Sequence, residues 1–311
     1  MNQYRYLIYS LIFTVLGFCV WIVLEDYQKV LDALNRVGWL GFLFVCVLSL
    51  LNYLIRYFRW KLFLKKLGDD TPFWDGLLCY FSGFALTTTP GKAGEVLRCF
   101  YLKNRHGVNY PHTMATLLVE RVNDAISGIL LALLVFYTFE DYRVIAYALL
   151  VFISSIVILI NRPALTLLVS SWFRFIKINF VQKMIDAVPM FVEKSATLLS
   201  VKNLSFGVLL GIFSWSAEAF GFAWVAHSLG GTAPVTLYMS IFAVGMIAGA
   251  LSFLPGGLGG TELVLFFLLK TTGLGDAEAL TVTLVCRLAT LWFAVVLGLL
   301  SVVWLQRSEV V

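Results

Sequence analysis

Charged side chains stand inside otherwise apolar stretches of this sequence in two groups. The first group contains three bases and three acids: Lys92, Glu95, Arg98, Glu120, Arg121 and Asp124. The second group contains two acids and one base: Glu218, Glu262 and Arg287. A charge near the centre of a membrane costs at least about 2.5–3.5 kcal/mol, so such groups pair or face a polar cavity. The bases suit the phosphate of a lipid headgroup, while the acids keep an empty cavity neutral and offer sites for protons.

Both groups stand beside breaks in the apolar sequence. The first break contains Pro90, Gly91 and Gly94. The second break contains Pro255, Gly256, Gly257 and Gly259. A helix that restarts after such a break presents unpaired N–H groups and the positive end of its dipole, which attract anions. The alternative is structural: each Pro-Gly turn ends one helix and begins another, and Arg121 with Asp124 forms a self-neutralised pair.

The two breaks belong to an internal repeat. Five residues around the first break recur 165 residues later: Ala85, Leu86, Pro90, Gly91 and Gly94 return as Ala250, Leu251, Pro255, Gly256 and Gly259. Further along the chain, Leu118-Val119-x-Arg121 recurs as Leu284-Val285-x-Arg287. The common order and the nearly constant offset favour a duplicated unit over chance.

The composition predicts a membrane protein. Hydrophobic residues make up 60% of the chain and charged residues 13%, against about 25% charged residues in a soluble domain. The net charge of +5 is modest and lies in a few loops, so it speaks to orientation rather than to nucleic acid. The sequence contains no Walker A loop, no HExxH and no GxSxG. We therefore expect no cofactor and no metal, and we do not expect an enzyme.

Several apolar runs approach the ~20 residues that cross a bilayer. Six of them are interpreted as full spans: 6–24, 39–57, 111–139, 144–160, 204–227 and 280–305. The basic cluster that begins at Arg56 favours the cytoplasm, which places the loop 25–38 outside and both termini inside. Arg59 with Trp60 at the membrane edge is mainly part of this topology signal, although it is also a candidate for holding a lipid phosphate.

Two further apolar segments, 72–102 and 236–270, are predicted to enter the membrane, break, and return on the same side. The first enters from the cytoplasm and the second from outside, so the halves form an inverted repeat. The predicted fold is an all-α polytopic membrane protein with about six transmembrane helices and two re-entrant helical hairpins. A single membrane domain, 1–311, contains the first repeat at 39–139 and the second at 203–305. Amphipathic helices at 163–200 lie between them at the cytoplasmic interface.

A set of motifs resembles a known family over nearly the whole chain. The motifs are Arg56-x-x-Arg59-Trp60, Pro90-Gly91-Lys92-Ala93-Gly94-Glu95-x-x-Arg98, Glu120-Arg121-x-x-Asp124, Pro255-Gly256-Gly257-Leu258-Gly259-x-x-Glu262 and Arg287-Leu288. Together they are similar to the membrane region of lysylphosphatidylglycerol synthases, which also occurs in stand-alone flippase-like proteins. The resemblance implies movement of phospholipid between leaflets. Aminoacyl transfer is not implied, because it belongs to a soluble domain that this sequence does not show.

We therefore expect an inner-membrane transporter for an anionic or zwitterionic phospholipid or a lipid-linked precursor. In this hypothesis Lys92, Arg98, Arg121, Arg287 and Arg59 bind the headgroup. One alternative is a membrane-embedded transferase or hydrolase acting on a lipid-linked phosphate, with a Glu or Asp as base. Another is an accessory subunit of an envelope lipid or glycolipid pathway. The expected partners are the lipid itself and either a second copy of the chain or an enzyme of lipid biosynthesis.

Overall fold

The computed structural model describes residues 27–89, 93–133, 144, 147–148, 151, 155, 179–252 and 254–307. Within these ranges every regular element is a helix, as the composition predicted. The predicted span 6–24 and nearly all of the span 144–160 lie outside the described residues. So do Pro90, Gly91 and Lys92 of the first break.

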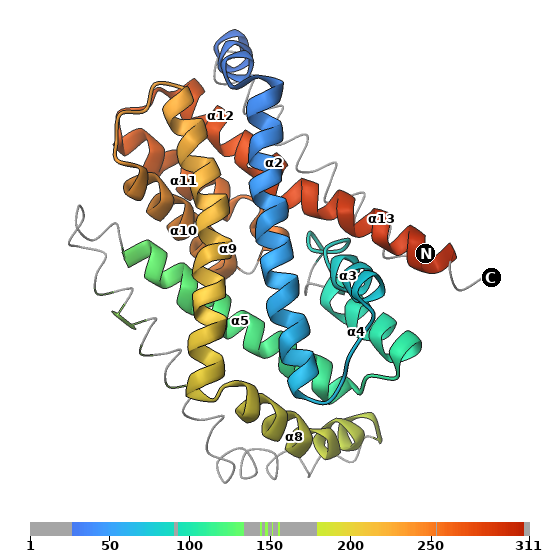
Figure 1. The fold of residues 1–311 in the computed structure, drawn as a ribbon. Helices are drawn as coiled ribbons and strands as arrows, with labels where there is room; N and C mark the ends of the chain where they lie inside the picture. The colour runs from blue at the N-terminus through green and yellow to red at the C-terminus, as the bar shows by residue number, and fades with distance from the viewer. Residues whose placement is uncertain are drawn as a thin grey trace.

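Two long helices, α2 (Tyr27–Lys66) and α9 (Val201–Ser228), run antiparallel side by side at the centre of the fold (Figure 1). At one end Lys66 Nζ donates a hydrogen bond to Asn203 Oδ1. Near the middle Asn52 Nδ2 donates to the carbonyl of Ser214 at 2.8 Å. Because residues later in α2 meet residues earlier in α9, the last turn of α2 and the last turn of α9 lie at opposite ends of the pair.

The start of α2 corrects one prediction. Residues 27–37 are helical where the sequence favoured a loop from 25 to 38, and a kink at Gly38 (φ 66°) joins them to the rest of the helix. Val30, Ala33 and Val37 are buried and share one helical face. They pack in the same core as Ala226 of α9, and this burial stabilises the helix. The charged residues in the segment had led to the prediction of a loop here.

The first hairpin follows the C-terminal end of α2. It consists of α3 (Phe73–Ser82), a series of turns, and α4 (Ala93–His106). The start of α4 lies so close to the turn after α3 that a Cβ on Gly94 would clash with the carbonyl of Gly83. Glycine at position 94 therefore allows the two arms of the hairpin to close on each other.

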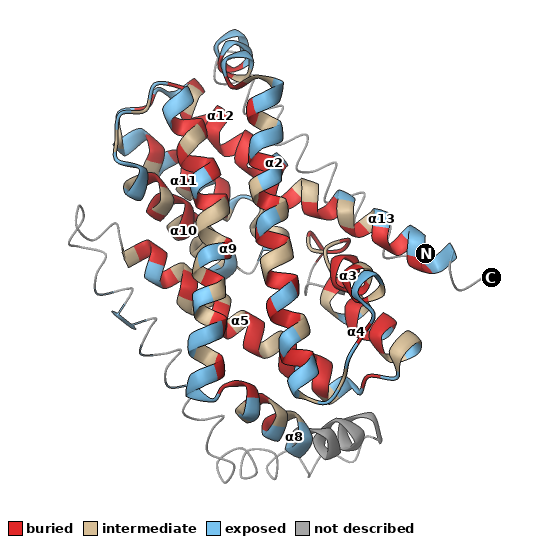
Figure 2. Cartoon of the chain, viewed as in Figure 1, coloured by how far each residue is buried: buried red, intermediate tan, exposed pale blue. Residues whose placement is uncertain are grey.

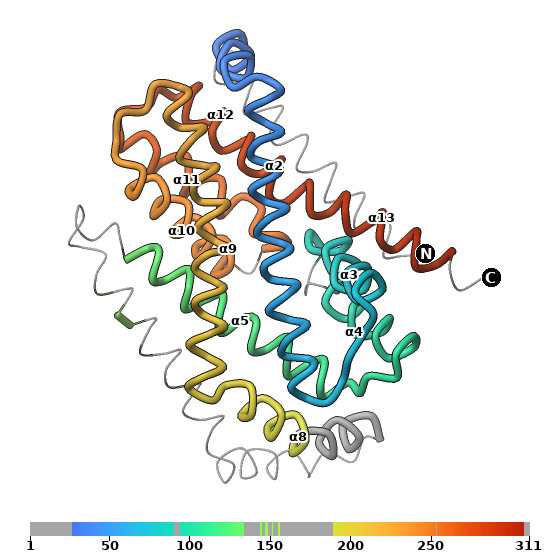
Figure 3. The backbone as a smooth tube through the Cα atoms, in the orientation of Figure 1, coloured from blue at the N-terminus to red at the C-terminus, as the bar shows by residue number. Residues whose placement is uncertain are grey.

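The second hairpin follows the C-terminal end of α9. It consists of α10 (Val235–Leu251), the short 3₁₀ helix η5 (Pro255–Gly257) and α11 (Gly260–Thr271). Since α2 and α9 are antiparallel, the two hairpins set out from opposite ends of the central pair, as Figure 3 shows. Their tips meet: a Cβ on Gly256 would lie 3.3 Å from Thr88 Cγ2.

The remaining helices bind the two halves together. Helix α5 (Tyr110–Ala132) packs against α9 and α10, and α8 (Asn179–Leu198) packs against α5. Helix α12 (Asp276–Arg287) continues through a π-helical turn (Leu288–Trp292) into α13 (Phe293–Arg307). Helix α12 belongs to the core of the second hairpin, whereas α13 packs against α3 of the first. The two halves therefore interlock.

Within the described residues, three helical stretches are long and apolar enough to cross a membrane: Tyr27–Lys66, Val201–Ser228 and Asp276–Arg307. Large apolar side chains on these stretches are exposed, such as Leu40 (79%) and Trp304 (67%). Figure 2 shows exposed residues recurring along the same ribbons. These exposed faces suit lipid rather than water. The charged residues of the sequence motifs lie mostly on the inward faces, where helices from both halves meet.

Candidate functional site

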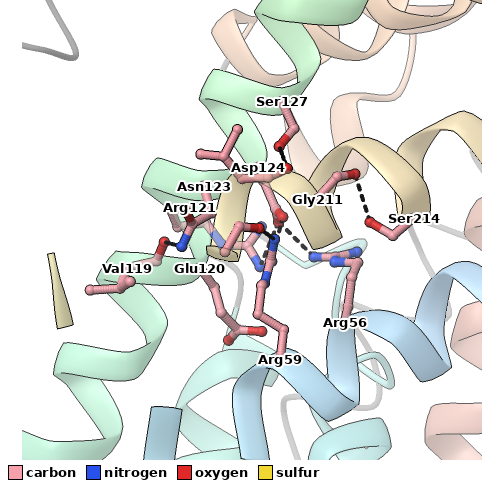
Figure 4. Close-up of polar contacts among 12 residues, drawn as sticks. Arg56, Arg59, Val119, Glu120, Arg121, Asn123, Asp124, Ser127, Gly211 and Ser214 are labelled. Atoms are coloured by element: carbon pink, nitrogen blue, oxygen red, sulfur yellow. Dashed lines mark hydrogen bonds and ion pairs between the residues drawn. The ribbon is translucent and has the colours of Figure 1, made fainter. Parts of the chain in front are cut away.

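Asp124 is the centre of a charge cluster between α5 and α2 (Figure 4). Arg59 Nη2 lies 2.6 Å from one carboxylate oxygen and Arg56 Nη2 lies 2.8 Å from the other. The Arg59 side chain has no exposed surface, and Arg56 stacks on the ring of Trp215 at 5.3 Å. We call Asp124, Arg56 and Arg59 the Asp124 cluster. It holds two buried cations on one carboxylate and joins the helices that carry them.

Glu120, one turn earlier on α5, ties the first hairpin to the same helix. Its carboxylate is fully buried and accepts hydrogen bonds from Arg98 Nη2 at 2.6 Å and from Tyr80 Oη at 3.1 Å. The Arg98 guanidinium also lies over the rings of Tyr80 and Trp60, at 4.9 and 5.5 Å. Arg98 is therefore surrounded by its own counter-ion and by aromatic faces that favour a cation.

Glu262 and Arg287 form the corresponding pair in the second half. Arg287 Nε donates to Glu262 Oε1 at 2.6 Å, and both side chains are at least 96% buried. The other Glu262 oxygen accepts from the backbone N–H of Gly259 at 2.7 Å. Arg287 Nη2 donates to the carbonyl of Gly256 at 2.8 Å. We call this arrangement the Glu262 clamp, because it holds both the helix start and the break at positive-φ glycines.

In the first half Arg121 is the counterpart of Arg287, and the acid that follows the break is Glu95; this pair is open. Arg121 Nε lies 3.6 Å from Glu95 Oε1, and the two side chains are 40% and 26% exposed. Arg121 also approaches Asp124 at 3.9 Å. The predicted pairing of Arg121 with Asp124 thus exists, but it is the longest contact that Asp124 makes to an arginine.

Glu218 lies on α9 and is 3% exposed. Among the residues that the structure describes, no hydrogen bond or ion pair reaches its carboxyl group. Arg56 of the Asp124 cluster and Arg287 of the Glu262 clamp are the cations close enough to act on it electrostatically. Glu218 therefore lies within electrostatic range of both charged assemblies and is bonded to neither.

The structure revises how the sequence assigned two arginines. Arg59 was a candidate for a lipid phosphate at the membrane edge, but it is wholly buried against Asp124. Arg56, interpreted only as a topology signal, belongs to the same cluster. The signal that reveals both is their spacing: positions i and i+3 lie on one helical face. When a basic cluster is interpreted only as a signal of membrane orientation, the arginines in it that point into the protein are missed.

The charges that the structure describes at the centre of the first half do not balance. Its central arginines are Arg56, Arg59, Arg98 and Arg121, and its central acids are Glu95, Glu120 and Asp124. Four bases against three acids leave one positive charge in excess. Arg56, Arg59 and Arg98 are buried, so the exposed part of this excess lies at Arg121. Arg121 is therefore a partly exposed cation near the hairpin tips, and it is available to bind an anionic group.

Apolar membrane-length helices around buried ion pairs define an integral membrane protein whose polar groups face its interior. Residues 7–298 match the family model of the lysylphosphatidylglycerol synthase TM region. The chain belongs to this family, as its motifs had indicated.

Curated relatives cover most of the chain. A UPF0104 membrane protein of Pyrococcus horikoshii is 23% identical over 297 residues, which is 87% of this chain and 89% of the relative. A UPF0104 membrane protein of Methanocaldococcus jannaschii is 22% identical over 321 residues, covering 97% of this chain and 94% of the relative. A third, from Methanothermobacter thermautotrophicus, is 24% identical over 292 residues, with 84% and 82% covered.

Proposed function

We propose that this protein moves a phospholipid or a lipid-linked precursor with an anionic or zwitterionic headgroup from one leaflet of the inner membrane to the other. Both termini lie in the cytoplasm in this proposal, and α3–α4 and α10–α11 are re-entrant hairpins from opposite faces. The family supports a lipid-related role through the name of its model. A second copy of the chain or an enzyme of lipid biosynthesis is the expected protein partner.

The observation that supports the proposal best is the meeting of the two hairpin tips. Thr88 and Gly256 are in contact, although their hairpins start from opposite ends of the α2–α9 pair. Broken helices at membrane depth are tolerated where protein or a polar cavity covers them, and transporters with inverted repeats place their substrate sites there. Each tip here lies beside its own acid–arginine pair.

The headgroup binds at Arg121 in this proposal. Arg121 is the partly exposed arginine among the central charges of the first half, which have one positive charge in excess. A phosphate can accept two parallel N–H bonds from its guanidinium group. Glu95 holds the arginine in the empty state and gives way to the phosphate. On α4, the neighbouring Val96 and Phe100 are 59% and 47% exposed. They provide an apolar surface along which the acyl chains remain in lipid while the headgroup crosses.

The test is reconstitution of the full chain into vesicles that contain a fluorescent phosphatidylglycerol. The wild-type protein is expected to exchange the probe between leaflets, and Arg121→Ala to reduce the initial rate at least tenfold. The matched control is Arg36→Ala, which removes an exposed arginine that pairs with Glu278 at 2.7 Å. Its rate is expected to equal that of the wild type.

Mass spectrometry of the same lipids separates transport from chemistry. An unchanged probe after many rounds of exchange supports a transporter, whereas a hydrolysed or transferred headgroup supports the enzymatic alternative. If folded Arg121→Ala exchanges lipid as fast as Arg36→Ala, Arg121 does not bind the headgroup. A wild-type protein that exchanges no lipid overturns the proposed function.

A further inference from the structure

Glu218 differs from every other buried carboxylate that the structure describes. Glu120, Asp124 and Glu262 each accept a hydrogen bond from a guanidinium at 2.6 Å. Glu218 is as deeply buried as Glu262, yet no hydrogen bond or ion pair in the described part of the chain reaches it. An unpaired carboxylate in such a place is very costly, and the neutral acid is far less so.

The surroundings of Glu218 contain ionisable groups from three other helices. Within electrostatic range of it lie Tyr53 and Arg56 of α2, Asp124 of α5, and Cys286 and Arg287 of α12. Helix α10 also packs against α9, but its one titratable side chain is Tyr238, which lies beside His227 at the far end of α9. Both nearby cations already have a carboxylate partner.

A charged Glu218 could nevertheless compete with the present partners of Arg56 and Arg287. Arg56 shares Asp124 with Arg59, and within the described residues its buried Nε has no acceptor. Arg287 divides its donors between Glu262 and the carbonyl of Gly256 at the second break. A negative charge at Glu218 would attract both guanidinium groups. It would weaken the bond from Arg287 to Gly256, and that bond fixes the break where the two hairpin tips touch.

We infer that Glu218 is the proton-binding group of this protein and couples the pH gradient to movement of the second hairpin tip. The inference rests on the proposed lipid transport and narrows its energy source to protons. The protonated acid leaves the Asp124 cluster and the Glu262 clamp closed. Release of the proton to water on one side of the membrane gives a carboxylate that draws Arg287 from Gly256 and frees the tip.

The first experiment measures transport under a proton gradient. The full chain is placed in phosphatidylcholine vesicles with fluorescent phosphatidylglycerol, and potassium with valinomycin holds the membrane potential at zero. One proton moved per lipid across one pH unit supports an accumulation of about tenfold in one leaflet. The wild type is expected to reach this ratio. Glu218→Gln, which resembles the protonated acid and keeps the second tip closed, is expected neither to accumulate the probe nor to exchange it faster than vesicles without protein. The control Glu278→Gln alters a partly exposed acid that pairs with Arg36, and it is expected to accumulate the probe like the wild type.

A wild type that exchanges lipid but never accumulates it under the gradient overturns the inference and leaves the proposed function standing. Accumulation that follows a sodium gradient instead also overturns it. A second readout does not depend on transport. Infrared difference spectra are expected to show the carbonyl stretch of a protonated carboxyl in the wild type and in Glu262→Gln, and to lose it in Glu218→Gln. Persistence of that band in Glu218→Gln overturns the inference even if no lipid moves.

Discussion

Each half of this protein contains an acid after its Pro-Gly break and an arginine at a repeated position, and these two acid–arginine pairs are in different states. In the second half Glu262 and Arg287 lie 2.6 Å apart, buried, and each also bonds to the backbone of the break. In the first half Glu95 and Arg121 lie 3.6 Å apart and partly exposed. One pair is a structural clamp, and the other keeps its charges accessible. The surroundings of each pair decide which of these two roles it has.

The difference originates in the helix that presents the arginine. Helix α5 contains Glu120 and Asp124, which draw buried arginines from α4 and α2. At the offset of 166 residues that relates Arg121 to Arg287, α12 and its continuation have Cys286 and Thr290. The hydroxyl of Thr290 bonds to the carbonyl of Cys286 within its own helix. With no competing acid one turn away on its own helix, Arg287 closes on Glu262.

The largest effect is expected from Asp124→Ala. The substitution leaves Arg56 and Arg59 buried without their shared carboxylate, and an uncompensated buried charge costs about 3–5 kcal/mol. We expect a loss near the upper end of this range in chemical unfolding in detergent micelles. Asp276→Ala, which removes the exposed partner of Lys270, is the control and should change stability by less than about 1 kcal/mol. Equal losses for both variants would show that the Asp124 cluster does not stabilise the fold.

A direct comparison of the two pairs comes next in size. Glu262→Ala leaves Arg287 with only the carbonyl of Gly256, so a loss of about 3 kcal/mol is expected. Glu95→Ala acts on a partly exposed pair and is expected to cost less than about 1 kcal/mol. Both are measured by the same unfolding titration. A loss at Glu95 as large as that at Glu262 would contradict the assignment of open and closed states.

The smallest effect is expected on lipid binding, and it tests whether the open Glu95–Arg121 pair serves the headgroup. Glu95→Gln removes the charge that competes with a lipid phosphate for Arg121, so binding of phosphatidylglycerol should strengthen about threefold, within the range of a partly exposed ion pair. Glu278→Gln should leave binding unchanged. Titration of detergent-solubilised protein with the lipid measures both. Weaker binding in Glu95→Gln would mean that Glu95 contacts the headgroup instead of competing with it.

The sequence predicted the parts of the fold that depend on local pattern. Long apolar runs gave α9 and the helical stretch that ends the chain, and Pro111 marked the start of α5. The second break, at positive-φ glycines, followed from residue type, as Gly256 and Gly257 show. The prediction of a loop at 25–38 was wrong. It was based on the charged residues of this segment, whereas the apolar stripe of Val30, Ala33 and Val37 stabilises a helix only when it packs against α9.

The membrane character, the repeated motifs and the identity of the charged residues were thus determined by the sequence alone, since hydropathy and spacing are properties of the chain itself. The partners of those charges were decided by the tertiary structure. Asp124 binds arginines 65 and 68 residues away instead of relying on Arg121 three residues away. Glu218 is left with no described partner. Which acid pairs with which arginine depends on which helices pack together and at what depth, and this cannot be inferred from the local spacing of residues.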